Sequence, residues 1–317
     1  MHRLAAATLA WTVCAGAVQA PDPAARARQR GQGFWSGLVR DCTVPAGESA
    51  FGLVVEATSL LGSPDPAWRD DVGYGVVASC VYTKRALGRD QRRALIDTLV
   101  ANLRHGLGET GTDSVLLRSF SALDLSVLAA LELDDHALDQ DGYRKLLDAA
   151  LGYLRAERDL RGLEPGVGWI HATAHTADLL KFLARDPRLT PADQARLLEG
   201  TWAKLTSPGT PVFTHAEDER LAAAVVSVVR RADFDAPGFQ RWLERFPRLE
   251  GEVWSVSPPP PAALDAAQNA RNLLRGLFVA LLLPSLATGD TPPRPPTPAE
   301  DAAREAVRQT LQKIRRS

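Results

Sequence analysis

Apolar residues recur every three or four positions along most of this chain, which is the spacing of one face of an α-helix. No segment shows the strict alternation of apolar and polar residues that is typical of a half-buried strand. The chain is therefore predicted to be all-α. The helical pattern covers residues 51–61, 72–82, 92–103, 115–131, 143–154, 170–183, 192–205, 221–229 and 273–283.

Local signals mark where several of these helices begin. Pro follows Asp65 and Thr190, at the first helical position that proline prefers, and Thr214 with Glu217 matches a capping box. Short breaks of Gly, Pro and Asp separate the helices, as in antiparallel helix pairs stacked in series. The turn at 63–69 resembles that of a HEAT-type repeat. We predict a HEAT-like solenoid or a related helical array.

The N-terminal residues have the pattern of a secretory signal peptide, because a basic start is followed by an apolar stretch and then by small residues. Cleavage is expected after Ala17, and Ala20 is the alternative, which the following Pro21 disfavours. We predict an exported protein, periplasmic or secreted, without a membrane span after cleavage. Its expected parts are a signal peptide (1–17), an N-terminal extension (18–46), a helical domain (47–286), a Pro-rich linker (287–298) and a charged C-terminal helix (299–317).

Composition and cysteine content limit the classes of protein to which this chain can belong. The chain is 45% hydrophobic and 24% charged, with a formal net charge of −1. This apolar content excludes a disordered chain, and the absence of a basic excess argues against a nucleic-acid partner. Once Cys14 leaves with the signal peptide, Cys42 and Cys80 remain. They form either a disulfide in an oxidising compartment or two buried thiols.

One glycine motif is set aside. Gly106, Gly108 and Gly111 match the spacing of a dinucleotide-binding loop, but that loop needs a strand before the first glycine. The preceding residues have helical periodicity. We therefore predict a loop between two helices and no dinucleotide cofactor.

The most informative segment carries His171, His175 and Asp178, whose spacings of four and three place them within about 60° of arc on one helix face. The rest of this helix is mostly apolar. Imidazole and carboxylate groups bind divalent metals or transfer protons near neutral pH, so a metal or acid–base site is one interpretation. A buried structural network is the other. Ala172 excludes the HExxH motif of zinc proteases, which needs Glu at that position.

This segment also resembles the signature Gly-Trp-x-His-x-x-Ala-His-x-x-Asp of an uncharacterised bacterial family, domain-of-unknown-function family 2785. Residues 117–123, 159–162, 217–221 and 272–275 are similar to further blocks of that family, and the resemblance extends over about 51–283. It implies a helical domain and no assigned activity. The matching positions of the signature are Gly168, Trp169, His171, Ala174, His175 and Asp178.

Other polar residues are expected to join the stripe in one cleft on the concave side of the array. Arg118 and Arg275 each lie among apolar residues of a predicted helix, and a buried Arg normally needs a carboxylate partner. Asp178, Asp218 and Glu219 are the candidate partners. The candidate ligand-binding residues are Arg118, Trp169, Asp218, Arg220 and Arg275.

Two functions remain open. The first is a helical-repeat protein of the cell envelope that binds an unknown small molecule or an envelope protein through an internal His/Asp/Arg site. The second is a metal-dependent, hydrolase-like enzyme, in which His171, His175 and Asp178 hold a divalent metal while Arg118 or Arg275 orients an anionic substrate. No cofactor other than that metal is suggested, and we favour the first function because no complete catalytic constellation is evident.

Overall fold

The structure is a computed structural model that describes residues 22–283 and 295–314. The predicted signal peptide, both of its cleavage points and Cys14 lie outside the described residues, as does most of the predicted Pro-rich linker.

The described residues form helices and one short β-hairpin. In chain order they are α1 (Pro23–Gln29), α2 (Gln32–Asp41), α3 (Ala50–Thr58), α4 (Pro66–Trp68), the π-helices η1 (Arg69–Tyr74) and η2 (Val77–Thr83), α5 (Arg89–Asn102), α6 (Ser114–Leu131), α7 (Gln140–Ala156), β1 (Leu163–Glu164), β2 (Gly168–Trp169), α8 (Ala172–Arg185), α9 (Pro191–Thr206), α10 (Glu217–Val229), α11 (Ala236–Leu243), α12 (Arg245–Trp254), α13 (Pro261–Leu282) and α15 (Pro298–Ile314).

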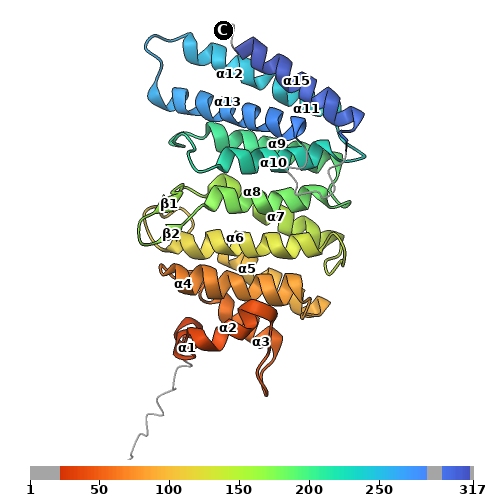
Figure 1. Cartoon of the computed structure of the whole chain (residues 1–317). Helices are drawn as coiled ribbons and strands as arrows, with labels where there is room; N and C mark the ends of the chain where they lie inside the picture. Colours follow the sequence, from red (N-terminus) through yellow and green to blue (C-terminus); the bar gives the residue numbers. More distant parts are fainter. Residues whose placement is uncertain (1–21, 284–294, 315–317) are drawn as a thin grey trace, which may run out of the picture.

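These helices stack in chain order, from α1–α4 at one end of the molecule to α12, α13 and α15 at the other (Figure 1). One layer consists of α6, α8, α10 and α13, each packed against the next. Helices α5, α7 and α9 form a second layer that packs against the first. In it, α5 packs on α6, α7 packs on α8, and α9 packs on both α7 and α13. This stacking brings residues from successive helices to the same edge of the array.

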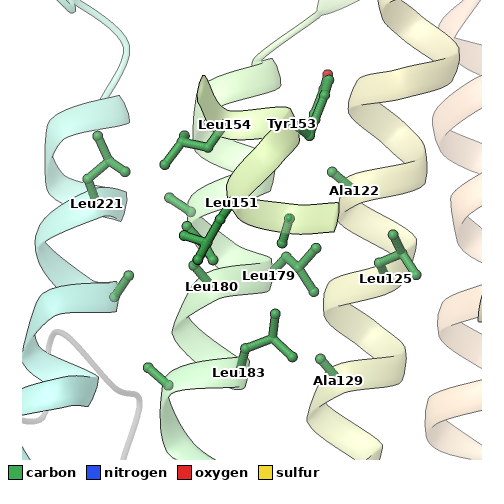
Figure 2. Close-up of a cluster of buried hydrophobic side chains, with 14 of the residues drawn as sticks. Ala122, Leu125, Ala129, Leu151, Tyr153, Leu154, Leu179, Leu180, Leu183 and Leu221 are labelled. Carbon is green, nitrogen blue, oxygen red and sulfur yellow. The ribbon is translucent and has the colours of Figure 1, made fainter. Parts of the chain in front are cut away.

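The core lies between the two layers. Figure 2 shows a part of it, where apolar side chains of α6, α7, α8 and α10 point into the space that these helices enclose. Leu125, Leu179 and Leu221 are fully buried there. The helices are held together by this apolar burial, which contributes about 25 cal/mol for each Å² removed from water.

The prediction of an all-α chain is confirmed, and each segment with the helical pattern overlaps a helix, although residues 59–61 follow α3 and residues 170 and 171 precede α8. The two-residue strands β1 and β2, paired antiparallel, are the exception among residues 22–283 and 295–314. Segment 72–82 forms two π-helical stretches instead of one α-helix. The likeness to HEAT repeats stays a prediction.

The expected N-terminal extension is packed into the array. Trp35 of α2 is fully buried, and its indole nitrogen donates to the carbonyl of Ala27. A disulfide joins Cys42, just after α2, to Cys80 in η2, with the two Cα atoms 4.9 Å apart. Of the two states that the sequence leaves open for this pair, the structure has the disulfide. The disulfide thus links the expected extension to the expected helical domain.

The C-terminal helix α15 is likewise part of the array. It packs on α11, α12 and α13 and buries Ala303 and Val307. Arg230 at the end of α10 donates to the buried carboxylate of Glu300 at 2.6 Å. This helix closes the last layer, so its apolar face does not meet solvent.

Helix α6 passes a length and composition test for a membrane span. It is the one helix within the described ranges that does so, and 72% of it is buried inside the molecule. Its apolar character follows from its place in the core, between α5 and α8.

Candidate functional site

A short hairpin positions the first residues of the site. Gly168 adopts φ +82°, and Arg69 donates to the carbonyl of Val167 at 2.7 Å from a position 98 residues earlier in the chain. A Cβ at Gly168 would lie 3.3 Å from the Arg69 guanidinium, so the glycine allows both the backbone turn and this close approach. The hairpin then delivers Trp169 to the start of α8.

His171 lies outside the helix on which its spacing predicts it. It is the residue before α8 and adopts the left-handed conformation, with φ +52°. Trp169 stacks on its ring, with the ring centroids 4.5 Å apart and the planes 21° from parallel. One face of the indole is therefore covered, yet Trp169 remains 42% exposed.

The hydrogen bond of His171 fixes its tautomer. Its Nε2 lies 2.6 Å from the carbonyl oxygen of His215, which can only accept, so Nε2 carries the proton. Glu217 Oε1 lies 3.6 Å from the same nitrogen. Nδ1 keeps its lone pair and has no hydrogen-bond partner among the residues that the structure describes.

His175 has the opposite tautomer. The Ser119 hydroxyl donates its only proton to the carbonyl of Ile170, so it accepts from His175 Nδ1, which lies 2.8 Å away. The ring also meets Phe120 edge-on, at a centroid distance of 5.0 Å. The lone pair of His175 is therefore on Nε2, for which the described part of the chain provides no partner.

Both imidazoles are held neutral. Burial lowers the pKa of His175 to about 3, and the charges of His171, Arg220 and Arg69 act in the same direction. Burial also lowers the pKa of His171, against the opposing effects of its bond to His215 and of the charge of Glu217. At neutral pH the site thus presents two uncharged hydrogen-bond acceptors.

Asp178 does not join the two imidazoles. Its carboxylate accepts from Arg220 on α10 and, at 3.2 Å, from Lys181 on its own helix. In the described part of the chain no three His, Cys, Asp or Glu side chains gather as a metal-ligand set. The two imidazoles and the ion-paired carboxylate of Asp178 therefore do not form the single cluster that the spacing predicts.

Two pockets adjoin at Arg220. The Trp169 pocket has a volume of about 450 Å³ and is lined by Asp70, Tyr74, Phe120, Leu123, Trp169, His171, His175, His215, Ala216 and Arg220. Ala216, the residue before α10, has a left-handed backbone conformation. The Arg275 pocket, of about 650 Å³, is lined by Asp178, Lys181, Asp218, Glu219, Arg220, Ala223, Asn272, Arg275, Gly276, Val279 and Ala280.

The π-helix η1 supplies two residues to the Trp169 pocket. Asp70 accepts from Arg69 Nε at 2.8 Å, and Tyr74 lies one turn later. Burial raises the pKa of Tyr74, and the nearby charges of Asp124 and Asp178 add to this effect, so its hydroxyl stays protonated. Short π-helical stretches often occur at functional sites, and this one brings a carboxylate and a phenol to the pocket.

Arg118 is not part of the site, which corrects the prediction of a single cleft. It is fully buried and pairs with Glu157, and its Nη1 donates to the carbonyls of His105 and Gly106. Arg118 lines neither pocket. The next residue, Ser119, is the one that bonds to His175, and adjacent residues of a helix point in different directions. The three glycines from Gly106 to Gly111 form a loop between α5 and α6, as predicted.

Arg275 and Asp218 take other places than predicted. Arg275 is exposed rather than buried and has no ion pair within the described residues. Asp218 is half-buried, which raises its pKa, and the charges of Glu219 and Glu217 add to this effect. Both line the Arg275 pocket, and no hydrogen bond or ion pair joins these two side chains. Asp218 is not the partner of a buried arginine.

The capping box expected from Thr214 and Glu217 is also wrong. Helix α10 begins at Glu217 itself, and the Glu217 carboxylate accepts from the backbone nitrogen of His215 at 2.9 Å. This bond helps to hold His215, which the sequence does not single out. A histidine just before a predicted helix start was a sequence signal for this residue. No local pattern, however, shows that His215 contacts His171.

Comparison with protein families gives one result. A family model described as "Protein of unknown function (DUF2785)" matches residues 103–279, more than half of the chain. The chain belongs to this family. The DUF2785 region runs from the end of α5 into α13 and contains Trp169, His171, His175 and Arg220, whereas Asp70 precedes it. No match was found among curated proteins or among solved structures.

Proposed function

We propose that this DUF2785 protein is an exported binding protein whose helical array holds a small ligand in the Trp169 pocket. The observation that carries the proposal is that one residue, Arg220, lines both pockets and pairs with Asp178. It connects the aromatic and imidazole groups of one pocket to the charged groups of the other. The two pockets thus share one charged side chain, which comes from α10.

The groups in the Trp169 pocket are held in place before any ligand binds. Trp169 rests on His171, His171 is bonded to His215, and His175 is bonded to Ser119. Binding sites with fixed polar groups lose less conformational entropy when a ligand binds. The volume of about 450 Å³ is within the range of small-molecule sites.

Export is supported by two independent features. The first 17 residues have the pattern of a signal peptide. The disulfide between Cys42 and Cys80 fits the oxidising environment that an exported protein reaches, because such bonds are rare in the cytosol.

The metal-dependent hydrolase has weaker support. Histidines that bind metals commonly donate their other nitrogen to a carbonyl or a similar acceptor, as His171 and His175 do here. Asp178, however, is engaged by Arg220 and Lys181 and would have to leave both to become a ligand.

Binding is tested with three named sets of probes: neutral mono- and disaccharides, the ions Zn²⁺ and Mn²⁺, and the anions phosphate and citrate. Calorimetry and ligand-observed NMR are run on the wild type and on the Trp169→Ala and Arg220→Ala variants. Trp254→Ala is the matched control, because Trp254 is also exposed (54%) but lines neither pocket.

We expect one set to bind saturably to the wild type and to Trp254→Ala, with affinity reduced at least tenfold in both pocket variants. No binding from any set, or binding that neither pocket variant weakens, would overturn the proposal. Stoichiometric metal that is lost in a His175→Ala variant would favour the hydrolase instead.

Export is tested separately by expressing the full chain with its own N-terminus in a bacterium and fractionating the cells. We expect to find the protein outside the cytoplasm. Its intact mass should be that of a chain that starts at residue 18. An uncleaved cytoplasmic chain would contradict export without affecting the binding proposal.

A further inference from the structure

Trp169 is 42% exposed and lines the Trp169 pocket. One face of its indole lies against His171, and the ring of His215 is nearly perpendicular to it at a centroid distance of 5.8 Å, so the opposite indole face is the one on which a ligand can stack. The π-face of an indole is electronegative and attracts weakly positive C–H groups. A flat ligand surface rich in C–H groups would therefore stack on it.

Directional hydrogen-bond groups line the same pocket as Trp169. The lone pairs of His171 Nδ1 and His175 Nε2 are fixed by the bonds that the other nitrogens make to His215 and Ser119. Asp70 adds a carboxylate acceptor and Arg220 adds guanidinium donors. The pocket thus offers acceptors and donors together, and hydroxyl groups satisfy both kinds.

The charges around the pocket disfavour ionic ligands of either sign. The charged groups at the pocket are already ion-paired, since Arg69 pairs with Asp70 and Arg220 pairs with Asp178. The two imidazoles are uncharged, so none of these groups offers an uncompensated charge to a cation or an anion. The site is electrostatically suited to an uncharged ligand.

We infer that the Trp169 pocket binds a neutral oligosaccharide, with one sugar ring stacked on the face of Trp169 opposite His171 and an adjoining sugar unit whose hydroxyl groups bond to His171 Nδ1, His175 Nε2 and Asp70. The ring supplies the C–H face for the indole, and the hydroxyls supply donors for the three acceptors. Arg220 donates to a ring or hydroxyl oxygen. The adjoining Arg275 pocket gives room for a further sugar unit. This inference rests on the proposed binding function and names its ligand class.

The experiment uses the mature full-length protein and a panel of glucose, galactose, mannose, N-acetylglucosamine, maltose, cellobiose and N,N′-diacetylchitobiose. Saturation-transfer NMR detects binding, and calorimetry measures Kd for each sugar that gives a signal. The expected result is saturable binding of at least one sugar, with the strongest transfer to the C–H protons of one ring face.

Three variants assign the contacts. Trp169→Ala is expected to raise Kd at least tenfold, and His171→Phe, which keeps a ring but removes the acceptor, about fivefold. Trp254→Ala is the matched control and is expected to leave Kd unchanged. Circular dichroism and thermal melting verify that each variant is folded. If Trp169→Ala does not fold, the indole N–H resonance of Trp169 in the wild type, assigned with Trp169→Phe, must shift on titration with the sugar.

Absence of binding across the sugar panel, or sugar binding that Trp169→Ala leaves intact, would overturn the inference. The proposed function would survive that result if Zn²⁺, Mn²⁺, phosphate or citrate still bound in a manner dependent on Trp169 or Arg220. It would fall together with the inference if no probe of any class bound, or if neither pocket variant weakened the binding.

Discussion

Arg118 Nε lies 2.6 Å from Glu157 Oε2, and this ion pair joins the interior of α6 to the residue that ends α7. Both side chains are almost completely removed from solvent. The second nitrogen pair, Arg118 Nη2 to Glu157 Oε1 at 3.1 Å, makes the contact bidentate. Lys204 of α9 donates to the Glu157 carbonyl at 2.9 Å, so one residue connects three helices.

Breaking this pair on one side should therefore destabilise the array strongly. Glu157→Gln leaves an uncompensated buried guanidinium, and such a loss costs about 3–5 kcal/mol. Urea unfolding of the purified protein measures it. The double variant Arg118→Met/Glu157→Leu should be more stable than Glu157→Gln, because it removes both charges of the pair; equal stability of the two variants would contradict the role of the pair.

His175 should make the protein sensitive to acid. Its pKa is about 3 in the folded state but ordinary, near 6.5, in the unfolded chain. Between these values the unfolded state binds the extra proton, so stability is complete above about pH 6.5 and is lost as the pH falls towards 3. The single group contributes a slope of about 1.4 kcal/mol for each pH unit in that window.

The variant His175→Asn isolates this effect, since its amide can still donate to Ser119. Urea unfolding from pH 7 to pH 4 is expected to show a shallower loss of stability in the variant than in the wild type. NMR should find no titration of the His175 ring above pH 4.5. Parallel stability curves, or a ring that titrates near pH 6.5, would show that the imidazole is not buried as described.

Asp124 should have the opposite pH dependence. Neither carboxylate oxygen has a partner in the described structure, the residue is 0% exposed, and burial raises its pKa well above the ordinary value. Above about pH 4 the unfolded state is ionised and the folded state keeps the proton, so this group costs stability as the pH rises.

Replacing Asp124 with Leu should therefore stabilise the protein by at least about 1 kcal/mol at pH 7.5, with a gap that narrows towards pH 4. Denaturant unfolding at several pH values measures it. Asp97→Leu, at an exposed position of α5, serves as the control and should change stability by less than about 0.5 kcal/mol. A less stable Asp124→Leu variant at pH 7.5 would mean that the carboxylate has a favourable partner.

The disulfide between Cys42 and Cys80 should stabilise the N-terminal end of the array, because it links α2 to η2 across 38 residues. We expect the Cys42→Ser/Cys80→Ser variant to lose about 2–4 kcal/mol of unfolding free energy. Reductant should lower the melting temperature of the wild type but not of the variant. Two thiols that react with maleimide in the unreduced, unfolded wild type would contradict the bond.

Local sequence patterns were sufficient to predict the helices but insufficient to predict the arrangement of the residues around His171. The period of apolar residues predicts α5 through α10 because each helix buries one stripe in the core, and Thr190 does cap α9 as its sequence suggests. The backbone conformation of His171 could not be predicted from the period of apolar residues. Its left-handed backbone is set by the hairpin before it, and Arg69 holds that hairpin from 98 residues away.

The sequence by itself determined that the chain is helical and that the family is DUF2785. Only the tertiary structure decided the partners: Glu157 for Arg118, Arg220 for Asp178, and the meeting of Trp169 and His215 at His171. The physical reason is range. Helical periodicity arises from contacts three and four residues apart, whereas a buried charge or imidazole is satisfied by whichever group the packed helices bring to it.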